Sequence, residues 1–284
     1  MAVLAQKGAL RVTIPFIDLS TQYQTYKERF DKAVFKVLDH GQYIMGPEVK
    51  ELESQLADFV GVKHALACSS GTDALVLPLM AKNLTSSDVI FTTTFTFFAS
   101  AEAITLAGAT PVFVDIDPDT YNIDPEALRE SIKNVLEQGE LTPRGIVPVD
   151  LFGLAADYDV INAIAQEYDL FVLEDAAQGF AADYKGNKAG SLADIAATSF
   201  YPAKPLGCYG DGGAVFTNDS ALYEKMVSLR VHGQDHAGNK YDNVRIGLNA
   251  RMDTIQAAVL LEKLKLYDDE IIQRQRVAER YTEL

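Results

Sequence analysis

Residues 145–175, GIVPVDLFGLAADYDVINAIAQEYDLFVLED, hold two apolar runs on either side of a helix-like segment. The runs at 145–150 and 169–175 are short and rich in Val, Ile and Leu, which is typical of strands buried on both faces. The segment 156–168 between them is long enough for a helix. Two strands that are connected by a helix usually run parallel to each other. This stretch therefore predicts a crossover unit of an α/β sheet.

The same alternation of strands and helices extends in both directions. It predicts a mostly parallel sheet sandwiched by helices. Further strands are expected at 64–68, 88–92, 111–117, 195–200 and 214–218. Helices are expected at 20–38, 47–60, from Ser70 onward, and at 97–106, 124–138, 219–233 and 250–284. Pro78 should kink or end the helix that begins at Ser70.

Composition narrows the possible functions. The 284 residues are 48% hydrophobic, enough for one large or two modest domains, and 25 basic against 40 acidic residues give a net charge of −15. That charge argues against nucleic acid or a membrane as partner. Cys68 and Cys208 have no paired spacing, which is typical of the reducing cytoplasm. Residues 1–13 are expected to be a leader, and they lack the continuous apolar core of a signal peptide.

One lysine lies in an unusual loop. Residues 199–218, SFYPAKPLGCYGDGGAVFTN, run from an apolar strand through a turn that carries Lys204 and into a second strand. Glycines in this loop permit positive φ angles and let the backbone approach a ligand closely. The alternatives are a ligand-binding lysine at a strand end and a plain hairpin with a solvated lysine.

Other candidate residues follow strand ends, where ligands bind in open α/β sheets. Gly71 and Thr72 begin a helix and suit a phosphate, although the motif also fits an ordinary capped turn. Asp175 ends a buried strand and needs a pyridinium, an arginine or a helix N-terminus as partner. Phe97 could stack on a flat ring or pack in the core. Ser199, at the next strand end, could reach the same phosphate.

Together these residues have one coherent chemical interpretation. A Schiff-base lysine, an aspartate beside a pyridinium, a phosphate at a helix start and a covering aromatic ring describe a site for pyridoxal 5′-phosphate (PLP). His64, His232 and His236 have no carboxylate or cysteine partner at metal spacing, so no metal is expected. A nicotinamide enzyme would need a G-x-G-x-x-G turn, which SSGTDAL is not.

Several motifs carry a family resemblance from Ile14 to the end of the chain. The sequence resembles the DegT–StrS family of PLP-dependent nucleotide-sugar aminotransferases, of fold type I. The matching motifs are GQYIMGPEVKELE (41–53), SGTDAL (70–75), TFFASAEAI (96–104), EDAAQ (174–178), SFYPAKPLGCYGDGGAVFTND (199–219) and IGLNARMDTIQAA (246–258).

The resemblance implies a role for each candidate residue. Lys204 and Asp175 would be catalytic, as the Schiff-base lysine and the partner of the pyridine nitrogen. Phe97 would stack on the cofactor and Gln178 would contact its ring or phenolic oxygen. Asn249 would reach a phosphate in the neighbouring subunit of a homodimer, with Arg251 beside it. The remaining cofactor ligands would be the phosphate-binding residues Gly71, Thr72 and Ser199.

The resemblance is greatest to members that aminate a UDP-linked 2-acetamido-3-oxo-glucuronic acid, with glutamate as amino donor, for bacterial O-antigen and related polysaccharides. It implies a PLP-binding large domain at 14–260 with an N-terminal helical segment. Residues 261–284 would begin a linker helix to a small domain that is missing or truncated. The alternatives are a truncated, catalytically silent PLP-binding member and a sugar dehydratase, although dehydratases of this family replace the lysine that Lys204 matches.

Overall fold

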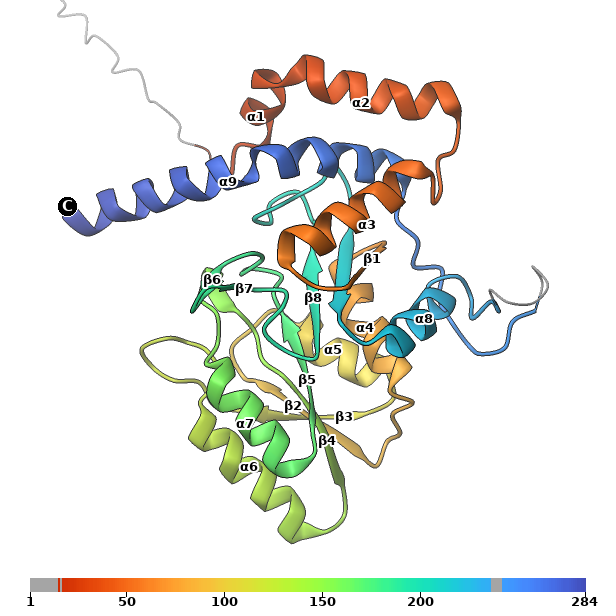
Figure 1. Ribbon diagram of the computed structural model, residues 1–284. Coiled ribbons are helices and arrows are strands. Elements are labelled where there is room, and N and C mark those ends of the chain that lie inside the picture. Colours follow the sequence, from red (N-terminus) through yellow and green to blue (C-terminus); the bar gives the residue numbers. More distant parts are fainter. Residues whose placement is uncertain (1–14, 16, 236–241) are drawn as a thin grey trace, which may run out of the picture.

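A seven-stranded sheet forms the centre of the protein (Figure 1). The computed structural model describes residue 15, residues 17–235 and residues 242–284, so the predicted leader at 1–13 and His236 lie outside the described residues. The strands are β1 (His64–Cys68), β2 (Asp88–Thr93), β3 (Thr110–Val114), β4 (Thr142–Val147), β5 (Phe171–Asp175), β8 (Ile195–Ser199) and β9 (Gly213–Thr217). Strands β6 (Asp183–Tyr184) and β7 (Asn187–Lys188) form a separate small ribbon.

The sheet is mostly parallel, as predicted. Its strand order is β1-β9-β8-β5-β4-β2-β3. Neighbouring strands pair in parallel except at β9, which runs antiparallel to both β1 and β8. The strands β8 and β9 therefore form the hairpin that the lysine loop predicted.

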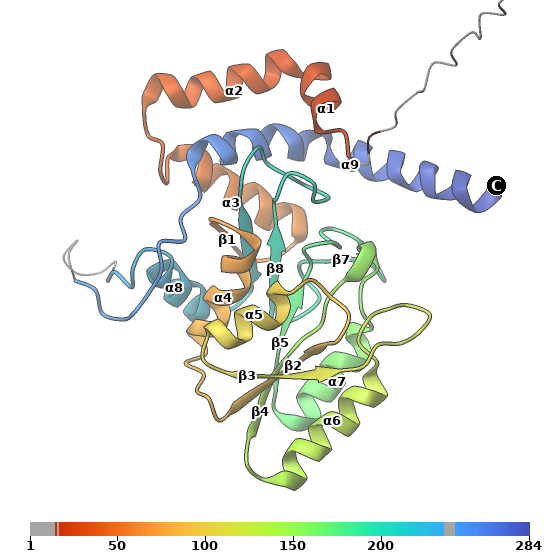
Figure 2. The ribbon, with the colours of Figure 1, turned by 180° about the vertical axis from the view of Figure 1, so that it is seen from behind.

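Helices cover both faces of the sheet (Figures 1 and 2). The helices α4, α5 and α8 share one core with the sheet, whereas α3 and α9 pack on the opposite face and α6 and α7 cover β4 and β5. The helices are α1 (Leu19–Thr25), α2 (Lys27–His40), α3 (Pro47–Val60), α4 (Gly71–Ala81), α5 (Ala99–Leu106), α6 (Pro125–Gln138), the 3₁₀ turn η1 (Leu151–Gly153), α7 (Tyr158–Tyr168), α8 (Ser220–Leu229) and α9 (Thr254–Glu283).

Strand β1 shows how the apolar runs build two cores at once. Leu66 and Cys68 face the helix α4, whereas Ala65 and Ala67 face α3 and α9. All four side chains are buried. A strand whose alternate residues enter different cores has no polar face, which explains the continuous apolar runs in the sequence.

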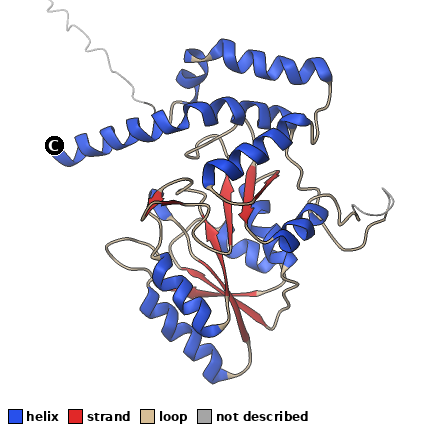
Figure 3. Cartoon of the chain, in the orientation of Figure 1, coloured by secondary structure: helices blue, strands red, loops and turns tan. Residues whose placement is uncertain are grey.

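Local signals fix several helix ends (Figure 3). The predicted cap Asp124 accepts hydrogen bonds from the N–H groups of Glu126 (2.8 Å) and Ala127 (3.3 Å). Gly41 and Gly61 end α2 and α3 with φ angles of 70° and 86°, which few residues other than glycine adopt. The helix α4 ends at Ala81, shortly after Pro78, as the lost backbone hydrogen bond predicts.

Two predicted helices are shorter in the structure. The helix expected at 219–233 ends as α8 at Leu229, and the one expected at 250–284 begins as α9 at Thr254.

Two other predicted helices differ more strongly from the structure. The segment predicted as one helix from Ser20 to Leu38 is two helices, α1 and α2, which meet at Tyr26. Tertiary packing accompanies the break, because Phe30 is buried against the ring of Tyr209, far along the sequence. The helix expected from Phe97 begins at Ala99, which leaves Phe97 in the preceding loop.

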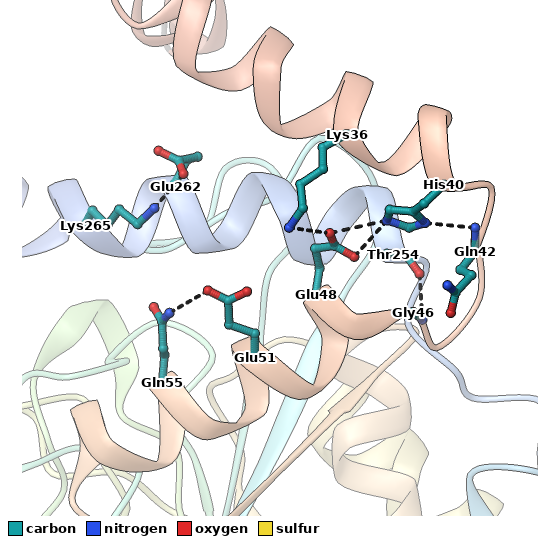
Figure 4. Close-up of polar contacts among 10 residues, drawn as sticks. All are labelled: Lys36, His40, Gln42, Gly46, Glu48, Glu51, Gln55, Thr254, Glu262 and Lys265. Carbon is teal, nitrogen blue, oxygen red and sulfur yellow. Dashed lines mark hydrogen bonds and ion pairs between the residues drawn. The ribbon is translucent and has the colours of Figure 1, made fainter.

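The N-terminal helices lie along α9 (Figure 1). The buried carboxylate of Glu48, at the start of α3, pairs with Lys36 Nζ (3.0 Å) and His40 Nε2 (3.2 Å) of α2 (Figure 4). Burial acts to raise the pKa of Glu48, but these contacts hold it below its usual value. The helix α9 continues unbroken across the predicted boundary at residue 260, and it is buried only as far as Tyr267.

Candidate active site

A cavity of about 930 Å³ lies at the carboxyl ends of β1, β2, β5 and β8, and we call it the strand-end cavity. Ligands of open α/β sheets generally bind at this end of the strands. The cavity brings together seven of the eight predicted site residues. They are Gly71, Thr72, Phe97, Asp175, Gln178, Ser199 and Lys204.

Lys204 projects into this cavity from a tightly closed loop between β8 and β9. The N–H of Phe200 donates to Gly212 O and the N–H of Cys208 donates to Phe200 O, both at 2.8 Å. A Cβ on Gly207 would lie 2.5 Å from the carbonyl oxygen of Pro202, so only glycine fits against the lysine turn. The hairpin alternative was therefore right about topology but wrong about a fully solvated lysine, because Lys204 is half-buried.

The charges of Lys204 and Asp175 influence each other across the cavity. Burial lowers the pKa of Lys204, and the nearby carboxylate of Asp175 opposes that shift. A lysine with a lowered pKa is more often neutral, and only the neutral amine can attack a carbonyl carbon or accept a proton. The loop therefore places a potential nucleophile and base in the strand-end cavity.

Asp175 lies at the end of β5 and is only 5% exposed. The hydroxyl of Ser100 donates to its Oδ2 (2.9 Å) and the N–H of Ala177 donates to its Oδ1 (3.2 Å). Burial raises the pKa of Asp175, whereas these hydrogen bonds and Lys204 oppose the rise. A turn and not a helix follows, so the N-cap alternative is wrong. In the described part of the chain no cation forms an ion pair with Asp175, and a pyridinium in the cavity fits this need.

The start of α4 forms the second end of the cavity. Ser70 caps this helix by accepting from the N–H of Asp73 (3.1 Å), as the capped-turn alternative predicted. The next two residues, Gly71 and Thr72, still line the cavity with first-turn N–H groups, which favour an anion. A Cβ on Gly71 would lie 2.5 Å from the Cβ of Ser199, so glycine lets the helix start meet the end of β8. These features fit a phosphate group.

Phe97 and Gln178 complete the walls. Phe97 is 69% exposed, so the core-packing alternative is wrong and the ring lies at the cavity surface. The N–H of Phe152 donates to Gln178 Oε1 (2.9 Å), which leaves the amide NH₂ of Gln178 for a ligand. Phe152 holds a φ angle of 58°, a strained value for a bulky residue and one that is common at binding sites.

Asn249 is the one predicted site residue that does not line the strand-end cavity. It is exposed, and its Oδ1 accepts a hydrogen bond from Arg251 Nε at 2.8 Å. Its reach into a neighbouring subunit stays a prediction. His64 lies against Ser220 and stacks on Tyr223. Among residues 15, 17–235 and 242–284 no group of three or more His, Cys, Asp or Glu side chains could hold a metal ion.

Several residues of the cavity could not be chosen from the sequence alone. They are Thr96, Phe152, Tyr201, Asp211 and Arg274, together with Ser100 behind Asp175. The motif TFFASAEAI contains Ser100, but nothing in its composition singles out this hydroxyl. Arg274 comes from α9, seventy residues after Lys204 in the chain, and only tertiary structure brings it near.

Two further carboxyl groups lie buried behind Asp175. Asp150 and Glu174 are both inaccessible to solvent. Asp150 Oδ1 accepts from Tyr158 Oη (2.9 Å) and the N–H of Ala156 (3.1 Å), while Oδ2 has no donor in the described part of the chain. Burial raises the pKa of Asp150 to about 7 and that of Glu174 well above its usual range. One proton shared by the two carboxyl groups would satisfy the orphaned oxygen.

We expect Asp150→Asn to reduce the pH dependence of stability. Because the folded state holds a proton that the unfolded state releases, the contribution of this pair to the wild-type free energy of unfolding should fall as pH rises from about 4 to about 7. Asparagine keeps the acceptor for Tyr158 and supplies a donor to Glu174 at every pH. The variant should therefore exceed the wild type by about 1–3 kcal/mol at pH 8 in denaturant unfolding. An equal pH dependence in both proteins would exclude the shared proton.

No helix in the described ranges 17–235 and 242–284 combines the length and apolarity needed to cross a bilayer.

Residues 24–284 match the model of the DegT/DnrJ/EryC1/StrS aminotransferase family. The UDP-2-acetamido-2-deoxy-3-oxo-D-glucuronate aminotransferase of Pseudomonas aeruginosa is 50% identical over 270 residues, which cover 94% of this chain and 72% of that protein.

Solved structures give the same result. An aminotransferase of this family from Brucella abortus superimposes with a TM-score of 0.93 at 50% identity, covering 95% of this chain and 72% of that one. DesV of S. venezuelae, in complex with a ketimine intermediate, gives 0.83 at 37% identity, covering 90% and 66%. The chain therefore belongs to the DegT/DnrJ/EryC1/StrS aminotransferase family, whose cofactor is pyridoxal phosphate.

Proposed function

We propose that this chain transfers an amino group from glutamate to a UDP-linked 3-keto sugar acid, in the synthesis of bacterial surface polysaccharides such as O-antigen. The observation that carries the proposal is the position of Lys204 and Asp175 in one cavity beside the start of α4. The substrate is inferred from the relative of P. aeruginosa, whose name specifies a UDP-linked 3-oxo-glucuronate.

We assign different chemical roles to the residues of the strand-end cavity. PLP, when bound, supplies an electron sink for the carbon that loses its proton. We assign to Lys204 Nζ the covalent attachment of the cofactor and, once released, the transfer of a proton between carbon atoms. We assign to Asp175 the retention of a proton on the pyridine nitrogen, since a buried carboxylate strongly favours a cation beside it.

The other residues bind and orient. Gly71, Thr72 and Ser199 would hold the phosphate with first-turn N–H groups and hydroxyls. Phe97 would cover one face of the ring, and the amide NH₂ of Gln178 would donate to the phenolic oxygen. Each assignment uses a group that the strand-end cavity leaves available to a ligand.

We further propose a cytoplasmic homodimer with shared active sites. Asn249 and the adjacent Arg251 are the residues that would reach the partner's phosphate site. Their position outside the strand-end cavity of their own chain is compatible with this role.

A direct assay tests the function. The purified chain is loaded with PLP and incubated with glutamate and UDP-2-acetamido-2-deoxy-3-oxo-glucuronic acid, and mass spectrometry follows the amino sugar and 2-oxoglutarate. We expect both products in equal amounts. Formation of 2-oxoglutarate without any amino sugar would reject the substrate assignment, and absence of both would favour the catalytically silent alternative.

A further inference from the structure

A second, smaller pocket adjoins the strand-end cavity. It has a volume of about 190 Å³ and lies between α1, the loop 202–207 and α9, and we call it the side pocket. Four residues line both the side pocket and the strand-end cavity, namely Ala203, Lys204, Pro205 and Arg274. The side pocket therefore lies next to the strand-end cavity, and Lys204 lines both.

Lys263 is the most unusual residue of the side pocket. It is only 6% exposed, and its Nζ atom forms no hydrogen bond or ion pair with any residue among 15, 17–235 and 242–284. Its ammonium lies over the ring of Tyr209, 4.6 Å from the centroid. Burial lowers the pKa of Lys263, while the carboxylate of Glu270 opposes the shift. A buried ammonium without an ion-pair partner is costly, which favours an anion in the pocket.

The carboxylates that line the side pocket have partners other than Lys263. Apart from Lys204, the lining contains the cations Lys263 and Arg274 and the carboxylates Asp18 and Glu270. Asp18 already caps α1, accepting from the N–H groups of Ser20 and Thr21. Glu270 accepts from Gln22 and lies 4.0 Å from Arg274. Neither carboxylate pairs closely with Lys263.

The geometry of α9 makes this arrangement rigid. Lys263, Glu270 and Arg274 are spaced by seven and four residues, so they share one face of the helix. Tyr267 lies on the same face and anchors it by donating to Phe180 O at 2.9 Å. The guanidinium of Arg274 donates to the carbonyl of Pro205 (3.2 Å), in the loop that carries Lys204. The helix therefore brings its two cations to the side pocket, next to the loop that carries the reactive lysine.

We propose that Lys263, assisted by Arg274, binds a substrate carboxylate beside Lys204. Two sources of this group are compatible with an aminotransferase: an amino-acid donor and, on the function proposed above, the uronic acid of the keto sugar. A pocket of this size holds a carboxylate and a short carbon chain but not a nucleotide. The site therefore acts on substrate affinity and not on the chemical step.

The test uses Lys263→Met, which keeps the apolar stem against Tyr209 and removes the charge, and Lys263→Arg, which restores it. Lys265→Met is the matched control, because Lys265 lies on the same helix, is half-exposed and pairs with Glu262 outside the side pocket (Figure 4). Each PLP-loaded variant is mixed with glutamate alone, and the bleaching of its absorption band gives an apparent Kd and a limiting rate. The KM for the keto sugar is measured separately.

We expect Lys263→Met to lower the affinity for one substrate about 10- to 100-fold, while the limiting rate stays within about twofold of the wild type. Lys263→Arg should recover most of that affinity. A change in the glutamate Kd identifies the donor carboxylate, and a change in the keto-sugar KM identifies the uronate. The glutamate measurement needs no sugar, so it remains valid if the proposed sugar is wrong. Unchanged constants for both substrates, or an equal loss in Lys265→Met, would overturn the carboxylate site.

Discussion

Replacing Lys204 by alanine should abolish covalent cofactor attachment. It should also reduce turnover by about 10²- to 10⁴-fold or more, because the loss of one general base alone has an effect of this size. The reason is positional, since no other lysine lines the strand-end cavity in the described part of the chain. Borohydride reduction of the PLP-loaded protein, followed by mass spectrometry, measures the attachment directly. Circular dichroism should show an unchanged fold, because the loop closes through backbone hydrogen bonds.

The matched control for this variant is Lys185→Ala. Lys185 lies in the turn between β6 and β7, away from the strand-end cavity. It is exposed and forms an ion pair with Asp159 of α7. It should retain full attachment and activity. A Lys204→Ala protein that still traps one equivalent of cofactor would show that another lysine carries it.

The second large effect is expected for Asp175→Asn, which should bind PLP but lose about 10²–10³ in turnover. Asparagine can still accept from the N–H of Ala177 through its oxygen, and its NH₂ can donate to Ser100 Oγ, so both local contacts survive with the second bond reversed. What disappears is the negative charge that would hold a proton on the pyridine nitrogen. Single-turnover mixing with glutamate measures the effect without the sugar.

Cofactor affinity provides the control for Asp175→Asn. A fluorescence titration with PLP should give a Kd within about tenfold of the wild type, because the phosphate end at Gly71 and Thr72 is intact. Wild-type turnover in this variant would contradict the role assigned to Asp175.

The sequence predicted the sheet well because its central strands are buried on both faces. The apolar runs at 65–68 in β1 and 171–173 in β5 contain no polar position that could suggest another structure. The lysine loop was equally clear, since its glycines fit only a backbone that passes close to other atoms, as at Gly207. Capping residues such as Asp124 gave correct helix starts, because they act within a few residues of the chain.

Features that depend on distant contacts were missed or misjudged. The packing of Phe30 on Tyr209, next to the break at Tyr26, joins residues far apart in the chain, so no local pattern records it. Phe97 is exposed because its helix begins two residues later than expected. Lys263 resembles any other lysine of an amphipathic helix until α1 and the loop 202–207 cover it. Such residues become visible only when the elements that surround them are in place.

The absorption spectrum of the PLP-loaded chain, before and after glutamate is added, tests the central claim most directly. A cofactor held by Lys204 beside a charged Asp175 should give a yellow band that glutamate bleaches, with one equivalent of 2-oxoglutarate released. A chain that forms no such band, or whose band is unchanged by glutamate and other amino donors, would contradict the assignment of the strand-end cavity as a working aminotransferase site.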